Sequence, residues 1–164
     1  YSSLMFEIGK IRIVQNPRLI TSIMMGGIST ILFGTVVYND LSALPETGYL
    51  EVPKGLIFRY FVAMALGGIF LGNLLVNLFG KAGVLGWILA LGAGAIVTFG
   101  AGLIGSLIGL LPDQLSNGFQ ATDLIAVAAG ALILPFALSD NTWLFLFFPA
   151  LIIIIHLWVK KLRK

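Results

Sequence analysis

The chain has no cysteine, little charge and only one histidine. Of its 164 residues, 10% are charged, whereas ordinary soluble domains carry about 25%. The lack of cysteine excludes disulfides, thiolate metal sites and cysteine nucleophiles. The lone histidine, His156, has no cysteine or acidic residue nearby in the sequence, and is therefore a poor centre for a metal or haem. We predict no metal and no other cofactor, and interpret His156 as an interfacial residue with a water or lipid partner.

Recognisable catalytic motifs are also missing. The sequence contains no Ser/His/Asp set, no HExxH and no phosphate-binding glycine loop before a lysine. Glycines 100, 102 and 105 have the spacing of a dinucleotide fingerprint, but that motif requires a strand–turn–helix context. General acid–base catalysis needs positioned titratable groups, which the interiors of the apolar runs do not supply. We therefore predict that the protein is not an enzyme.

Apolar residues dominate what is present. They make up 59% of the chain, and the mean hydropathy is +1.03. This composition predicts an all-α, polytopic membrane protein that forms a single membrane domain over residues 1–164. Long apolar runs predict four transmembrane helices, at about residues 19–38, 56–79, 84–111 and 142–159. Residues 1–18 are either a short interfacial helix or a basic flank, and residues 39–55 and 112–122 read as polar connections.

Residues 124–138 form a fifth apolar segment that is short and contains Pro135. A run of this length often fails to cross a bilayer. One interpretation is a re-entrant segment that enters and leaves the membrane on one side, which is permitted only where protein or a watery cavity covers the irregular backbone. The other interpretation is a tilted fifth span.

The distribution of charge favours the first interpretation. Four spans place both termini on the same side, and most basic residues then face the cytoplasm, as the positive-inside rule requires. Five spans would separate the two basic termini. We therefore predict that both termini are cytoplasmic, in a bacterial inner membrane or an organellar membrane. The residues on the cytoplasmic side would be Lys10, Arg12, Arg18, Lys81, Lys160, Lys161, Arg163 and Lys164.

The central run, residues 84–111, is rich in small residues at helical spacing. Such rows let membrane helices approach closely. The rows are Gly86, Ala90, Gly94, Thr98, Gly102 and Ser106, then Gly105 and Gly109 beside Ala101, with Gly68 and Gly72 in the preceding span. A four-residue spacing drifts by roughly 40° per step in an α-helix. We therefore expect the long row to pack against at least two elements, one of them residues 124–138.

Asn73 and Asn77 are the most polar residues within a predicted span. Their spacing places them on one helix face, where they either bond to another helix or line a polar path. The run Gly72–Gly80, GNLLVNLFG, resembles the second-helix segment of small fluoride channels. Residues 98–100 read threonine-phenylalanine-glycine, where that family has a threonine-phenylalanine-serine-threonine break. The chain is therefore not assigned to that family.

Charged residues near the span ends suggest two further contacts. Arg59 and Asp123 lie near the same predicted membrane boundary, where they either form an ion pair or remain separately among the headgroups. The C-terminal residues Lys160, Lys161, Arg163 and Lys164 are suited to anionic lipid headgroups.

Abundant packing surface without catalytic chemistry predicts a non-enzymatic integral membrane subunit. It would serve an accessory, assembly or structural role in a membrane protein complex, through its glycine-rich helix faces. The alternative is a small oligomeric channel or transporter for an ion or small solute. The expected partners are membrane lipids and other transmembrane helices, in a homo- or hetero-oligomer. No nucleic-acid partner is expected.

Overall fold

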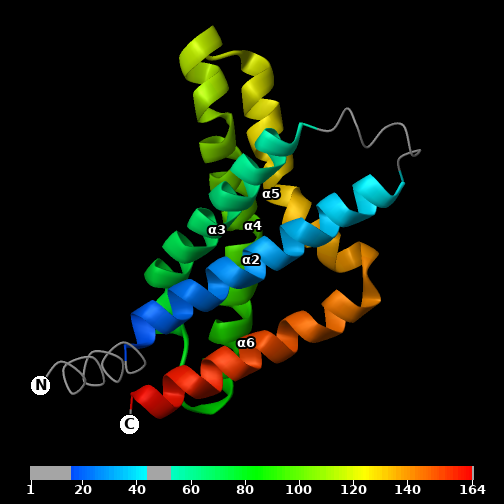
Figure 1. Ribbon diagram of the computed structural model, residues 1–164. Coiled ribbons are helices and arrows are strands. Elements are labelled where there is room, and N and C mark those ends of the chain that lie inside the picture. The colour runs from blue at the N-terminus through cyan, green and yellow to red at the C-terminus, as the bar shows by residue number, and fades with distance from the viewer. Residues whose placement is uncertain (1–15, 44–52, 164) are drawn as a thin grey trace, which may run out of the picture.

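The computed structural model describes residues 16–43 and 53–163, and over these residues the chain is helical, without strands (Figure 1). Within these residues, five helices are long and apolar enough to cross a membrane, which supports the all-helical membrane class. The predicted segment 1–18 lies almost entirely outside the described residues, as do residues 44–52 of the polar loop. The elements are α2 Pro17–Ser42, α3 Lys54–Leu75, the 3-10 turn η2 Val76–Leu78, α4 Gly83–Asn117, α5 Ala121–Asp140 and α6 Thr142–Leu162.

Side-chain caps define where α2 and α6 begin. Oδ1 of Asn16 accepts a hydrogen bond from the backbone N–H of Arg18 at 3.0 Å, and Pro17 occupies the first helical position. Asn141 caps α6 in the same way, accepting from the N–H of Trp143 at 3.1 Å. These caps satisfy N–H groups that a helix cannot pair internally.

Helix α4 is longer than predicted. It continues through Pro112 to Asn117 and has 35 residues, about 52 Å of helix against a hydrocarbon core of about 30 Å. The expected connection at 112–122 was therefore wrong for its first half. Proline removes one hydrogen bond of the preceding turn, but the helix continues beyond it. The end of α4 and the start of α5 consequently project away from the other helices (Figure 1).

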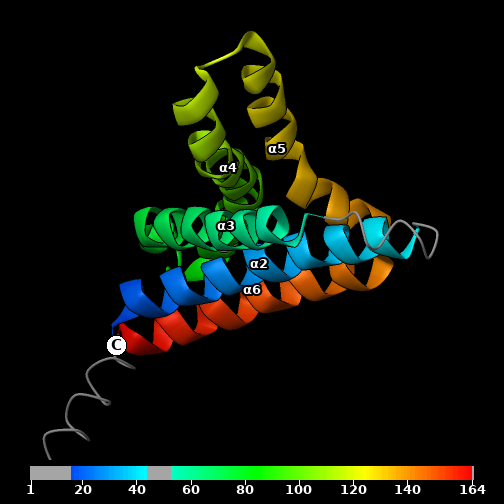
Figure 2. The same cartoon turned by 45° about the horizontal axis from the view of Figure 1, so that its top comes forward.

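Helix α5 is also longer than the apolar segment 124–138. It has 20 residues and contains Pro135. The helix bends part-way along its length (Figure 2). Proline has no N–H to donate, and the missing backbone hydrogen bond makes such a bend easier. Its length is sufficient to cross a membrane, so length alone does not distinguish the four-span from the five-span interpretation.

Helices α2, α3 and α6 lie in one layer, and α4 packs on one face of this layer at an angle to its helices (Figures 1 and 2). Helix α6 runs antiparallel to α2, so the start of α2 and the end of α6 lie side by side in both views. We call this the basic end, with Arg18, Lys81, Lys160, Lys161 and Arg163. We call the opposite end, together with the α4–α5 connection, the acidic end, with Asp40, Asp113, Asp123 and Asp140.

Candidate functional site

The pair Gly68 and Gly72 allows α3 to lie directly against α2. A methyl group at Gly72 would be 2.8 Å from the carbonyl oxygen of Thr21, and one at Gly68 would be 2.6 Å from that of Met25. Both distances are shorter than van der Waals contact. The two glycines therefore set how closely α2 and α3 approach.

The long row on α4 contacts two different helices. A methyl group at Gly94 would lie 2.8 Å from Cδ1 of Ile152 in α6. Further along, a methyl group at Gly102 would overlap the carbonyl oxygen of Gly130 in α5, and Ser106 also packs on Gly130. The row thus turns from α6 to α5 along its length, in agreement with the prediction that one neighbour cannot cover it.

The second row on α4 faces α3. A methyl group at Gly105 would lie 2.5 Å from Sδ of Met64, and one at Gly109 would lie 2.5 Å from Cε1 of Tyr60. Since Gly68 and Gly72 face α2, helix α3 is enclosed by close helix contacts on two sides.

The other residues of the long row, Gly86, Ala90 and Thr98, are buried. Gly86 packs on the carbonyl group of Lys81 in the preceding turn instead of on another helix. Oγ1 of Thr98 donates to the carbonyl oxygen of Ala95 at 2.7 Å. The Thr98 hydroxyl is thus satisfied within α4, and the residue acts as a small side chain at a helix contact.

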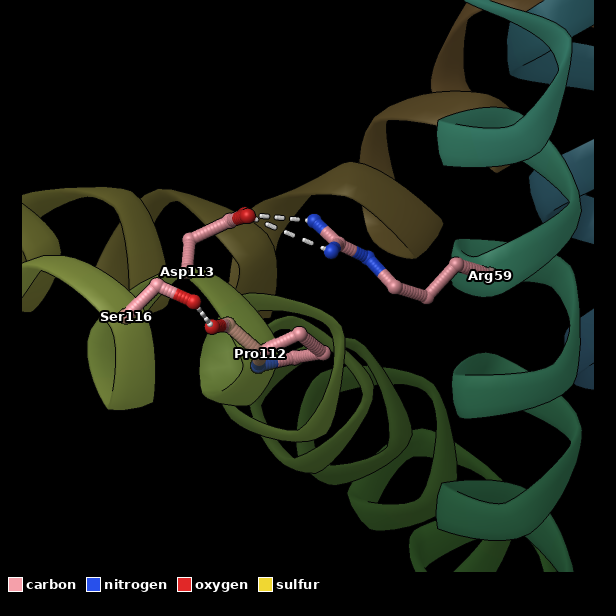
Figure 3. Close-up of polar contacts among 4 residues, drawn as sticks. All are labelled: Arg59, Pro112, Asp113 and Ser116. Carbon is pink, nitrogen blue, oxygen red and sulfur yellow. Dashed lines mark hydrogen bonds and ion pairs between the residues drawn. The ribbon is translucent and has the colours of Figure 1, made fainter.

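An ion pair links the start of α3 to the end of α4 (Figure 3). Nη2 of Arg59 lies 2.5 Å from Oδ2 of Asp113, and Nη1 lies 3.3 Å from Oδ1. The side chains are 27% and 55% exposed, so water screens the pair. Nearby, Oγ of Ser116 donates to the carbonyl oxygen of Pro112 at 2.9 Å, which satisfies one carbonyl group near the end of α4.

The partner of Arg59 is therefore Asp113, and of the two alternatives for Arg59 and Asp123 the ion pair is not formed. Oδ2 of Asp123 instead accepts the backbone N–H of Gln120 at 2.9 Å, in a capping box that begins α5. The continuation of α4 beyond Pro112 causes this difference, because it carries Asp113 on a helix alongside α3.

Asn73 and Asn77 are both exposed, and neither side chain forms a hydrogen bond within residues 16–43 and 53–163. Asn73 lies in the last turn of α3, whereas Asn77 lies in the 3-10 turn η2. Helix α3 ends between them, so they do not share a continuous α-helical face. Asn73 lines a groove between α2, α3 and α4.

His156 is buried, contrary to the interfacial interpretation. Its side chain is 0% exposed, its Nδ1 accepts the backbone N–H of Gly80 at 3.2 Å, and its ring centroid lies 4.4 Å from that of Trp87. An accepting Nδ1 places the proton of the neutral ring on Nε2, and Nε2 is buried without a hydrogen-bond partner among the described residues. Sequence reasoning missed this contact because His156 and Gly80 are far apart along the chain.

The basic C-terminus is partly engaged within the chain. Nη2 of Arg163 donates to the carbonyl oxygen of Val76 at 2.8 Å, so this residue ties the end of α6 to η2. Lys160 and Lys161 form no salt bridge within the described residues, which leaves their predicted contact with lipid headgroups as a prediction. Lys164 lies outside the described residues.

The described residues contain no group of three or more His, Asp or Glu side chains that could hold a metal ion. No protein-family model, curated protein or solved structure matches the chain. The prominent features of the described chain are therefore its close helix contacts and the grooves beside them.

Proposed function

We propose that the protein is a non-enzymatic integral membrane subunit that docks a transmembrane helix of another protein or of a second copy. The observation that carries this proposal is an apolar groove of about 500 Å³ on the outer side of α4 and α5. Its lining combines small residues with larger apolar ones. The small residues are Ala95, Gly100 and Ala131, and the larger ones are Ile96, Phe99 and Leu103. Small residues beside larger apolar ones form the kind of surface on which membrane helices pack.

We further infer a four-span topology in which α5 enters and leaves on one side. Two observations support it. The Arg59–Asp113 pair joins the end of α4 to the first turns of α3, and Asp140, at the end of α5, lines a pocket with Asp40, at the end of α2. The start of α5 thus follows a helix end that is joined to the start of α3, and the end of α5 lies beside the end of α2. With basic residues at the opposite end, the positive-inside rule makes that end cytoplasmic.

A small oligomeric channel or transporter is the second candidate function. The exposure of Asn73 and Asn77 favours it, because copies arranged around an axis would bring these amides together along a polar path. The proposals differ in what Asn73→Leu and Asn77→Leu should do. A docking subunit should still assemble, whereas a channel should lose flux of monovalent ions in proteoliposomes.

Purification in a mild detergent tests the docking proposal. The protein should co-purify with a stoichiometric membrane partner or as a homo-oligomer, measured by native mass spectrometry. Ala95 is exposed and lines the groove, so the larger side chain of Ala95→Leu would fill it. This variant should reduce the associated fraction several-fold.

Ala150→Leu in α6 is the matched control, because Ala150 is exposed and lies outside the groove. It should leave the associated fraction unchanged. A wild-type protein that is monomeric at all concentrations and carries no partner would contradict the proposal. Equal effects of Ala95→Leu and Ala150→Leu would do so as well.

A further inference from the structure

A second groove, of about 740 Å³, lies between the start of α2, the outer side of α3 and the middle of α4. Most of its wall is leucine, isoleucine and phenylalanine, including Leu66, Phe70 and Ile108. Leu66 and Phe70 are 47% and 53% exposed. In a bilayer this wall faces hydrocarbon, and a groove of this size accommodates part of an acyl chain.

The polar residues of the groove gather at one end. Asn16, Arg18 and Ser22 belong to the start of α2, and Asn73 belongs to the last turn of α3. A methyl group at Gly72 would lie 3.0 Å from Cα of Ser22, so these two helix ends are adjacent. The groove therefore has a polar mouth and an apolar interior.

Each polar group at the mouth can donate a hydrogen bond. Oδ1 of Asn16 is used by the helix cap, which leaves its NH₂ group available. The side chains of Ser22 and Asn73 form no hydrogen bond within the described residues. The guanidinium of Arg18 adds a positive charge with several N–H donors. This set suits a phosphate diester, which only accepts hydrogen bonds.

The surrounding charge also favours an anion. The mouth opens at the basic end, whereas the acidic residues Asp40, Asp113, Asp123 and Asp140 of the described chain all lie at the acidic end. The only salt bridge within residues 16–43 and 53–163 joins Arg59 to Asp113. Arg18 therefore has no acidic partner among the described residues.

We propose that this groove is a binding site for one anionic phospholipid. The phosphate lies at the mouth against Arg18 and Asn73, and an acyl chain runs along Leu66 and Phe70 toward Ile108. Charge complementarity at the mouth selects an anionic over a zwitterionic headgroup, and the apolar wall requires a lipid instead of free phosphate. The site does not depend on either proposed function.

Native mass spectrometry of the detergent-purified full chain tests this site, by titration with phosphatidylglycerol and with phosphatidylcholine of identical acyl chains. The wild type should bind phosphatidylglycerol about five-fold more tightly, the effect of one basic residue near an anionic headgroup. Arg18→Gln should abolish this preference. Lys161→Gln removes the same charge at the same end but outside the groove, and should retain the preference.

Two further measurements separate a lipid site from general charge attraction. Leu66→Trp, at an exposed position, should fill the groove and weaken binding of both lipids several-fold, while the thermal unfolding temperature remains unchanged. Soluble glycerol phosphate should not compete, because it has no acyl chain to bury. Equal losses in Arg18→Gln and Lys161→Gln would overturn the proposal, as would competition by glycerol phosphate. Unchanged lipid binding in Leu66→Trp would also overturn the proposal. It would mean that residues 1–15 or a second copy of the chain, and not a lipid, occupy the groove.

Discussion

The backbone N–H of Gly80 donates a hydrogen bond to Nδ1 of His156, a residue 76 positions later in the chain. Gly80 has φ +76°, and a methyl group there would lie 2.9 Å from the backbone nitrogen of Lys160. Only glycine combines this conformation with this close approach. The α3–α4 turn is thereby fixed against the end of α6, with the ring of Trp87 against His156.

His156→Phe should destabilise this junction. Phenylalanine retains a ring beside Trp87 but leaves the N–H of Gly80 without its acceptor, which costs about 1–3 kcal/mol. We expect a lower unfolding temperature in detergent and faster hydrogen exchange of the amide of Gly80. Leu157→Phe, at a position 49% exposed, is the control and should change neither. Unchanged exchange at Gly80 in His156→Phe would show that this hydrogen bond does not hold the turn.

Gly102→Ala should disrupt the contact between α4 and α5. The added methyl overlaps the carbonyl oxygen of Gly130, and overpacking of this kind costs about 1–3 kcal/mol. Gly92→Ala is the matched control on the same helix, because nothing lies within 4 Å of its added methyl. It should be neutral or stabilising by about 0.5–1 kcal/mol, because glycine is less favourable than alanine in the interior of a helix. Thermal unfolding measures both variants, and equal effects would contradict the close contact.

A double-mutant cycle should identify the acidic partner of Arg59. Combining Arg59→Gln with Asp113→Asn should give a measurable coupling free energy, because the two side chains form two hydrogen bonds. Combining Arg59→Gln with Asp123→Asn should give none, since Asp123 caps its own helix. The coupling should weaken with added salt, as expected of an exposed pair. Coupling of similar size in both cycles would indicate a general effect of charge.

Single cysteines should resolve the four-span and five-span topologies, because the chain has no cysteine of its own. In the four-span topology, Asn117→Cys before α5 and Ser139→Cys near its end should be labelled by an impermeant maleimide from the same side. Lys161→Cys should be labelled from the other side. If α5 crosses the membrane, Asn117→Cys and Ser139→Cys will be labelled from opposite sides.

The amino-acid sequence by itself determined the membrane class and the surfaces used for helix packing. Hydropathy is a local sum, so long apolar runs identify the helices without knowledge of their neighbours. The small residues at four-residue spacing likewise identify a close-packing face, and the winding of an α-helix implies two neighbours for the long row. The contacts of Gly94 with α6 and of Gly102 with α5 agree with this reasoning.

The tertiary structure alone decided the polar contacts. Whether Arg59 reaches Asp113 or Asp123 depends on α4 continuing past Pro112 and on how α4 lies against α3. The burial of His156 depends in the same way on the turn at Gly80 approaching the end of α6. Helix periodicity assigns residues to faces within one element, but the pairing of side chains from different elements depends on how the helices are placed relative to one another.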